Sequence, residues 1–201
     1  MSKPLTVSQL AAHPDLITET FPFRGETITF RLLRCDDEEM LARYFVGLGE
    51  ETRRRYGPHP FTAEQAAKLC AELNYADTLR FLAVSTRSGA PEIVAYFIVY
   101  LGPREGEIKR YSERGITLGS DVCTLAPSVA DAYQGLGLGS EVMRRVLDVM
   151  RRLGFRRMVL SGGTQATNDR AIHFYEKFGF RRVGDFVTPG PLNNHDMILT
   201  L

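Results

Sequence analysis

The sequence contains no tryptophan and only three cysteines, Cys35, Cys70 and Cys123, among its 201 residues. An odd number of thiols without paired spacing indicates reduced cysteines and not a disulfide framework. The N-terminus also lacks an apolar segment followed by a small-residue cleavage site, so no signal peptide is expected. Together these absences predict a cytoplasmic protein.

Long apolar runs, an excess of one charge and metal-ligand spacing are missing as well. The most apolar stretch, residues 93–101, is too short to cross a bilayer, so we expect no membrane association. The balance of 25 Lys and Arg against 24 Asp and Glu argues against general nucleic-acid binding. The histidines form no ligand motif with the cysteines, and we expect no metal site. With 44% hydrophobic residues, the composition is that of an ordinary globular domain.

The pattern of apolar and turn residues predicts alternating strands and helices. Residues 1–25 contain the breakers His13-Pro14 and Phe21-Pro22, so we expect an irregular N-terminal extension before a domain spanning 26–201. Pro127 lies in an extended run and predicts a bulge or a departure from the sheet, because proline cannot donate a ladder hydrogen bond. The expected strands are 27–34, 79–86, 92–100, 116–129, 157–160, 180–187 and 195–201, and the expected helices begin at Asp36 and Thr62 or span 139–153 and 168–178.

The run Gln134-Gly135-Leu136-Gly137-Leu138-Gly139 lies between an extended segment and the clearest helix. Glycines at alternate positions allow close backbone approach, and the free N–H groups of a helix N-terminus favour an anion. The run therefore predicts a phosphate or pyrophosphate cradle, with a turn whose glycines only relieve strain as the alternative.

Two phosphate-binding classes fit this loop poorly. A nucleoside-triphosphate P-loop would need a lysine before its serine, and Gly139-Ser140 has none. A dinucleotide-binding unit would need an acidic residue for the ribose, and residues 149–168 contain no Asp or Glu.

Two motifs in the correct order resemble the GCN5-related N-acetyltransferase (GNAT) family. That family's acyl-CoA loop has the pattern Gln/Arg-x-x-Gly-x-Gly/Ala, which Gln134, Gly137 and Gly139 match. The run from Asn168 to Phe180 is similar to the family's Asn-x-x-Ala-x-x-x-Tyr-x-x-x-Gly-Phe helix. The resemblance implies an α/β (α+β) fold: a mixed, mainly antiparallel twisted sheet of about seven strands flanked by about four helices, whose splayed central strands form the acyl-CoA cleft.

The resemblance further implies an N-acyltransferase that passes an acetyl group from acetyl-CoA directly to a primary amine of a small molecule or protein. Asn168 would bind the pantetheine arm, cap its own helix, or do both. Tyr175 would protonate the departing thiolate, with core packing as the alternative role. The residues that this resemblance places on the cosubstrate are Ser128, Val129, Gln134, Gly135, Leu136, Gly137, Leu138, Gly139, Ser140, Asn168 and Tyr175.

The acceptor side of the reaction is less well specified. An alkylammonium must lose a proton before it attacks, so a base is needed. Thr124 stands where some family members carry a glutamate, which leaves Asp121 and Glu113 as the nearest upstream candidates. Tyr56 and His59 are predicted to contact the acceptor, beside an arginine run at 53–55 that would receive an acidic molecule or form a solvated charged face.

Several alternatives stay open at this level. A non-catalytic CoA-binding sensor or interaction domain of the same fold is the second functional hypothesis, because no acid stands at Thr124 and Pro127 interrupts the strand. The acceptor could be a protein lysine, an N-terminus, a polyamine, an amino acid or an antibiotic. The sequence does not decide whether the protein forms a homodimer.

Overall fold

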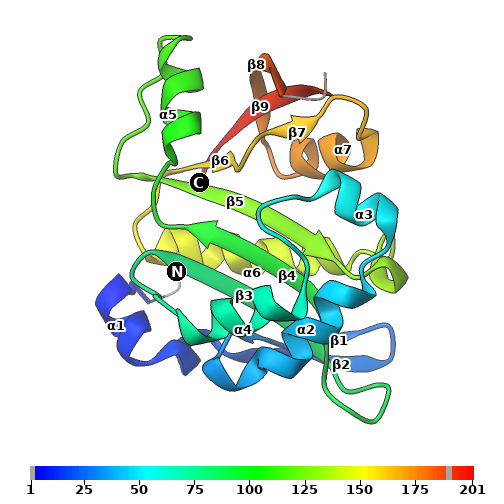
Figure 1. Ribbon diagram of the computed structural model, residues 1–201. Helices are drawn as coiled ribbons and strands as arrows, with labels where there is room; N and C mark the ends of the chain where they lie inside the picture. The colour runs from blue at the N-terminus through cyan, green and yellow to red at the C-terminus, as the bar shows by residue number, and fades with distance from the viewer. Residues whose placement is uncertain (1–2, 189–191) are drawn as a thin grey trace.

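The computed structural model describes residues 3–188 and 192–201, which contain one nine-stranded sheet (Figure 1). The strand order is β1-β2-β3-β4-β5-β6-β9-β7, with β8 paired to the other edge of β9. Of the strand pairs, β5 and β6 are parallel and the rest are antiparallel, so the predicted mixed, mainly antiparallel sheet is confirmed. The strands are β1 Glu19–Phe23, β2 Glu26–Leu32, β3 Thr78–Ser85, β4 Glu92–Tyr100, β5 Val122–Val129, β6 Arg157–Leu160, β7 Thr164–Gln165, β8 Arg181–Thr188 and β9 Leu192–Thr200.

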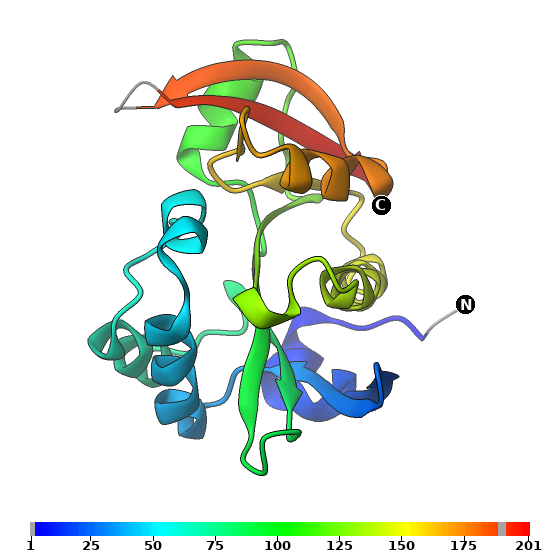
Figure 2. The same ribbon diagram turned by 90° about the vertical axis from the view of Figure 1, so that its right-hand side faces the viewer.

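Helices cover both faces of this sheet (Figure 2). One buried cluster joins α2 and α4 to side chains such as Leu82 and Tyr96, a second joins α1, α6 and α7 to Phe81 and Phe97, and a third, smaller cluster surrounds Tyr111 of α5. Within the described part of the chain, no helix is both long and apolar enough to cross a membrane. The α-helices are α1 Val7–Ala12, α2 Glu38–Gly47, α3 Glu50–Arg55, α4 Ala63–Ala71, α5 Glu105–Ser112, α6 Leu138–Arg152 and α7 Asp169–Lys177, and short 3₁₀ turns occupy Pro14–Ile17, Cys35–Asp37 and Asp131–Tyr133.

The apolar residues of helix α6 recur at a spacing that predicts the helix and the face that it buries. Val142, Val146 and Met150 recur at helical spacing, and all of them are fully buried against the sheet. The predicted helix at 139–153 therefore agrees with the observed bounds to within one residue at each end.

Residues 7–23 form regular elements, which corrects the expectation of an irregular extension over residues 1–25. Helix α1 and the 3₁₀ turn bury Leu10 and Ile17, and β1 pairs with β2 through residues 19–23. Pro22 does not break β1, because β1 lies at the edge of the sheet, where a missing N–H removes no ladder bond.

Pro127 does not break its strand either, contrary to expectation. β5 pairs with β4 in continuous register from Thr124 to Val129. Ala130 donates its N–H to Val94, so alternation turns the nitrogen of Pro127 away from β4. On that open side the pairing with β6 ends at Leu125, and no bond is lost. The two strands separate beyond this point, which is the splay that the resemblance implied.

Candidate functional site

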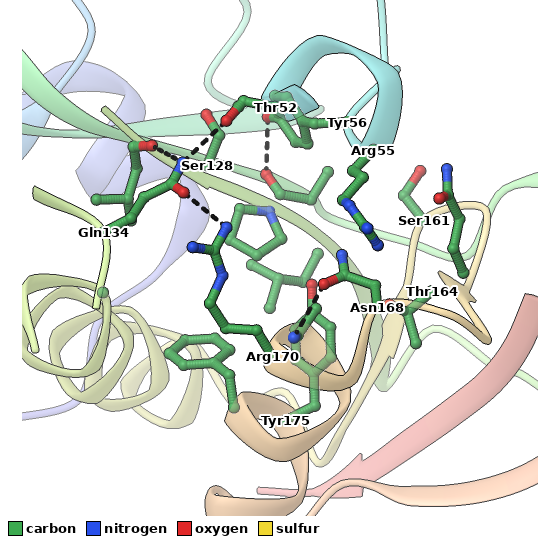
Figure 3. Close-up of a pocket in the computed structure, with 18 of the residues that line it drawn as sticks. Thr52, Arg55, Tyr56, Ser128, Gln134, Ser161, Thr164, Asn168, Arg170 and Tyr175 are labelled. Atoms are coloured by element: carbon green, nitrogen blue, oxygen red, sulfur yellow. Dashed lines mark hydrogen bonds between the residues drawn. The ribbon is translucent and has the colours of Figure 1, made fainter. Parts of the chain in front are cut away.

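A cavity of about 860 Å³ opens where β5 and β6 separate. One part of its wall is formed by the glycine loop and α7, and another part by α3 and the turn between β6 and β7. Figure 3 shows side chains from these elements pointing into the same space. The cavity therefore joins the two sequence motifs to a region that neither motif specified.

Glycine is required at the three loop positions for different physical reasons. Gly135 and Gly137 have φ of 72° and 99°, in the left-handed region that favours glycine. Gly139 has no such φ, but a Cβ there would lie 3.4 Å from Val129 Cγ2 and 3.6 Å from Phe174 Cε2. Two glycines thus make the turn, and the third permits close packing of α6 against β5 and α7.

The start of α6 is suited to an anion. Gly137 is its N-cap and no side chain caps the helix. Ser140 and the glycines at 135, 137 and 139 line the cavity. Leu136 and Leu138, which were also predicted to contact the cosubstrate, do not line the cavity, since the side chain of Leu138 is fully buried and that of Leu136 is exposed to solvent. The geometry fits the predicted pyrophosphate cradle.

The Gln134 side chain ties the loop to its surroundings (Figure 3). Its Nε2 donates to Val129 O at 2.9 Å and to Thr52 Oγ1 at 3.0 Å. Its Oε1 accepts from Arg170 Nη2 at 2.6 Å, which bridges the loop to α7. Gln134 therefore positions the loop with its side chain, a role that the motif alone did not reveal.

Asn168 and Tyr175 lie on the α7 side of the cavity. Asn168 Oδ1 accepts from the N–H of Ala171 at 3.3 Å, so the helix-cap role is present. Tyr175 is 7% exposed, and burial raises the pKa of its hydroxyl well above the usual value. The phenol is consequently protonated at neutral pH and faces the cavity as a hydrogen-bond donor.

Two tyrosine hydroxyls form hydrogen bonds with the second half of β5. Ser128 Oγ lies 2.7 Å from the hydroxyl of Tyr44 and donates to Tyr96 O at 3.3 Å, so Tyr44 donates to Ser128. Tyr56 donates to Ala126 O at 3.1 Å and lines the cavity. The predicted Tyr56 thus reaches the site, where it also anchors the end of α3 above β5.

The structure does not bring the predicted base candidates to the cavity. Asp121 lies just before β5, at the end where β5 and β6 are still paired, and its carboxylate accepts from Arg157 at 2.9 and 3.0 Å. These hydrogen bonds hold the pKa of Asp121 below its usual range, which makes it a weak base. Glu113 is an exposed residue at the C-terminal end of α5 and does not line the cavity.

His59, which was predicted to contact the acceptor, does not line the cavity. It packs against Phe45 with ring centroids 5.0 Å apart, and its Nε2 lies 3.3 Å from the Tyr96 hydroxyl. Burial lowers the pKa of His59. It packs instead in an aromatic cluster with Phe45, Phe61 and Tyr96.

Sequence reasoning missed the part of the wall that follows β6. Residues 161–165 line the cavity because Gly162 and Gly163, with φ of 65° and 67°, turn the chain between β6 and β7. The Gly-Gly pair was the available signal for this turn. Within residues 3–188 and 192–201, no group of three or more His, Cys, Asp or Glu side chains could hold a metal ion.

Comparison with known proteins identifies the family. The family model described as the Acetyltransferase (GNAT) family matches residues 48–180. Acetyltransferase PA5475 of Pseudomonas aeruginosa is 31% identical over 152 residues, which are 72% of this chain and 72% of that protein.

Solved structures show the same fold. The GNAT domain of S. lividans PAT has a TM-score of 0.72 at 20% identity, over 94% of this chain and 99% of that chain. The aminoglycoside acetyltransferase AAC(6')-Ib, solved with paromomycin and acetyl-CoA, has a TM-score of 0.64 at 22% identity, over 86% and 93% of the two chains.

Proposed function

Because this chain belongs to the GNAT acetyltransferase family, we propose that its cavity binds acetyl-CoA along the glycine loop and transfers the acetyl group directly to an amine. The observation that carries the proposal is the convergence of the loop 134–140, Asn168 and Tyr175 on one cavity. The mixed sheet, splayed between β5 and β6, supplies the space. A cytoplasmic location is part of the proposal, supported by the free thiols of the cysteines.

Different parts of the cavity wall have separate tasks in this proposal. The backbone at the start of α6 would hold the pyrophosphate, since its N–H groups and the helix dipole favour an anion. Ser128 and Val129 at the end of β5 and Asn168 at the start of α7 line the same cavity, where they would contact the pantetheine arm. The thioester of acetyl-CoA supplies the activated acetyl group.

Tyr175 is the residue best suited to assist the leaving group. The amine nitrogen forms a bond to the acetyl carbon while the carbon–sulfur bond breaks and sulfur gains the electron pair. The protonated Tyr175 hydroxyl can donate its proton to that sulfur to give the CoA thiol, the amine loses its proton to water, and water returns a proton to the Tyr175 phenolate. Direct transfer is preferred to a thioester on Cys123, because that thiol is fully buried and burial raises its pKa to about 12.

A non-catalytic CoA-binding domain is less well supported. Thr124, whose lack of an acid motivated it, is fully buried and donates to Gly102 O at 3.0 Å, so this position does not face the cavity. Pro127 leaves the strand intact.

Isothermal titration with acetyl-CoA tests the proposal. We expect one site per chain with a dissociation constant in the micromolar range, about 1–100 μM, as is typical of enzyme substrates. Absence of heat and of any thermal stabilisation at millimolar acetyl-CoA would contradict it. Desulfo-CoA should bind with similar affinity, since the pyrophosphate and not the thioester provides most of the expected contacts.

A further inference from the structure

One part of the cavity wall has an unusual charge distribution. It is formed by residues 51, 52 and 54–58 of α3 and the following turn, residues 161–165, and Asn194. Among all the described residues that line the cavity, Glu51 is the single acidic one. The basic ones are Arg54, Arg55, Arg170 and Lys177. A positively charged acceptor therefore has no free carboxylate to pair with.

Glu51 is already neutralised by its neighbours. One carboxylate oxygen accepts from Arg54 Nη2 at 2.7 Å and the other from Arg55 Nε at 2.5 Å. These bonds lower the pKa of Glu51, so it is a weak base as well as a poor partner for a cation. The group of three carries one net positive charge.

Arg55 brings this charge into the cavity. Figure 3 shows its side chain extending from α3 toward the side where Ser161, Thr164 and Asn168 lie. The side chain is 23% exposed, and its Nη1 donates to Thr167 O at 3.2 Å, which fixes the guanidinium across the opening. Within the described residues, Nη2 makes no hydrogen bond and is available to an anion.

The lack of a free carboxylate also bears on the type of amine. The α-amine at the N-terminus of a peptide has an ordinary pKa of about 7.7–8.0, whereas that of a lysine side chain is about 10.4. A substantial fraction of such a peptide α-amine is already neutral near pH 7.5, so its attack depends less on a strong base in the cavity.

We propose that the acceptor is an α-amine carried by an acidic molecule, either a free amino acid or the N-terminus of an acidic peptide, whose carboxylate pairs with Arg55. This inference rests on the proposed acetyl transfer and names its acceptor class. Polyamines and other polycations are the acceptors that the same charges disfavour.

Matched probes test the acceptor class by the rate of CoA release. The pairs are L-alanine with L-alaninamide, and Ala-Glu-Ala-amide with Ala-Gln-Ala-amide, and spermidine is the cationic probe. In at least one pair, we expect kcat/KM to be about ten-fold higher for the probe with the carboxylate than for its amide counterpart. A ten-fold difference is about what one hydrogen-bonded charge pair would provide. The pair that shows the difference distinguishes a free amino acid from a peptide.

The variant Arg55→Gln tests the residue. It should raise KM for the acidic probe about ten-fold and remove the difference within the pair, with kcat and the affinity for acetyl-CoA little changed. Arg151→Gln, an exposed arginine on α6, is the control and should change neither.

Failure of this inference differs from failure of the proposed function. If the protein does not bind acetyl-CoA, the proposed function itself is wrong. If acetyl-CoA binds, three outcomes would overturn the acceptor class: equal rates within both pairs, faster transfer to spermidine, or transfer to none of the probes. An unchanged preference in Arg55→Gln would overturn the role of Arg55.

Discussion

Replacing Gly137 by valine is expected to weaken acetyl-CoA binding by about 100-fold, the loss of about 3 kcal/mol of charged hydrogen bonding. Gly137 has φ of 99° and ends the turn before α6, a conformation that a β-branched residue rarely adopts. The loop must then rearrange, and its N–H groups no longer converge on the pyrophosphate. Titration of the purified variant with acetyl-CoA measures the effect.

Gly154→Val is the matched control for this result. Gly154 has φ of 86° and, like Gly137, no atom within 4 Å of a Cβ built on it, but it follows α6 at the end remote from the loop. Both variants should lose about 1–3 kcal/mol of folding stability through backbone strain. Equal affinity of the two variants for acetyl-CoA would contradict the assigned role of the loop.

Tyr175→Phe is expected to lower kcat by about 10²–10⁴-fold, the usual contribution of a general acid. The dissociation constant for acetyl-CoA should change little, because the phenyl ring keeps the packing against Phe174 and Phe180. Tyr111→Phe is the control for loss of a buried hydroxyl: it removes the bond to Met197 O at 2.8 Å, remote from the cavity. This control should lose about 1 kcal/mol of stability and retain its kcat.

The pH profile gives an independent readout of Tyr175. An acid must be protonated to act, and burial raises the pKa of Tyr175 above its ordinary value near 10. The proton is therefore present throughout the range from about pH 7 to 10. Wild-type kcat should show no decline from this group over that range. If the Tyr175→Phe variant kept the full wild-type kcat at every pH, Tyr175 could not be the general acid.

Much of the fold could be predicted because periodicity and turn chemistry agree with the final packing. The strand 92–100 and the strand 157–160 match β4 and β6 at both ends. Helix α3 and helix α5 were missed, since α3 has no buried residue and the first turn of α5 follows no clear capping signal. The strand expected over 116–129 begins only at Val122.

The loop and α7 residues that line the cavity could be predicted from sequence because they form local motifs. The other lining residues could not, since they come from α3, the β6–β7 turn and β9, which meet only in the folded chain. Asp121 shows the limit most clearly. Sequence proximity to β5 suggested a base, but only the pairing of β5 with β6 reveals which end of the strand opens.

The most direct test of the account is the initial rate of CoA thiol release from acetyl-CoA, measured with and without an amine and together with the mass of the products. The account predicts release that depends on the amine and equals the amount of acetylated amine formed, with no acetyl group left on the protein. Binding of acetyl-CoA without amine-dependent release across acidic, neutral and cationic amines would contradict it.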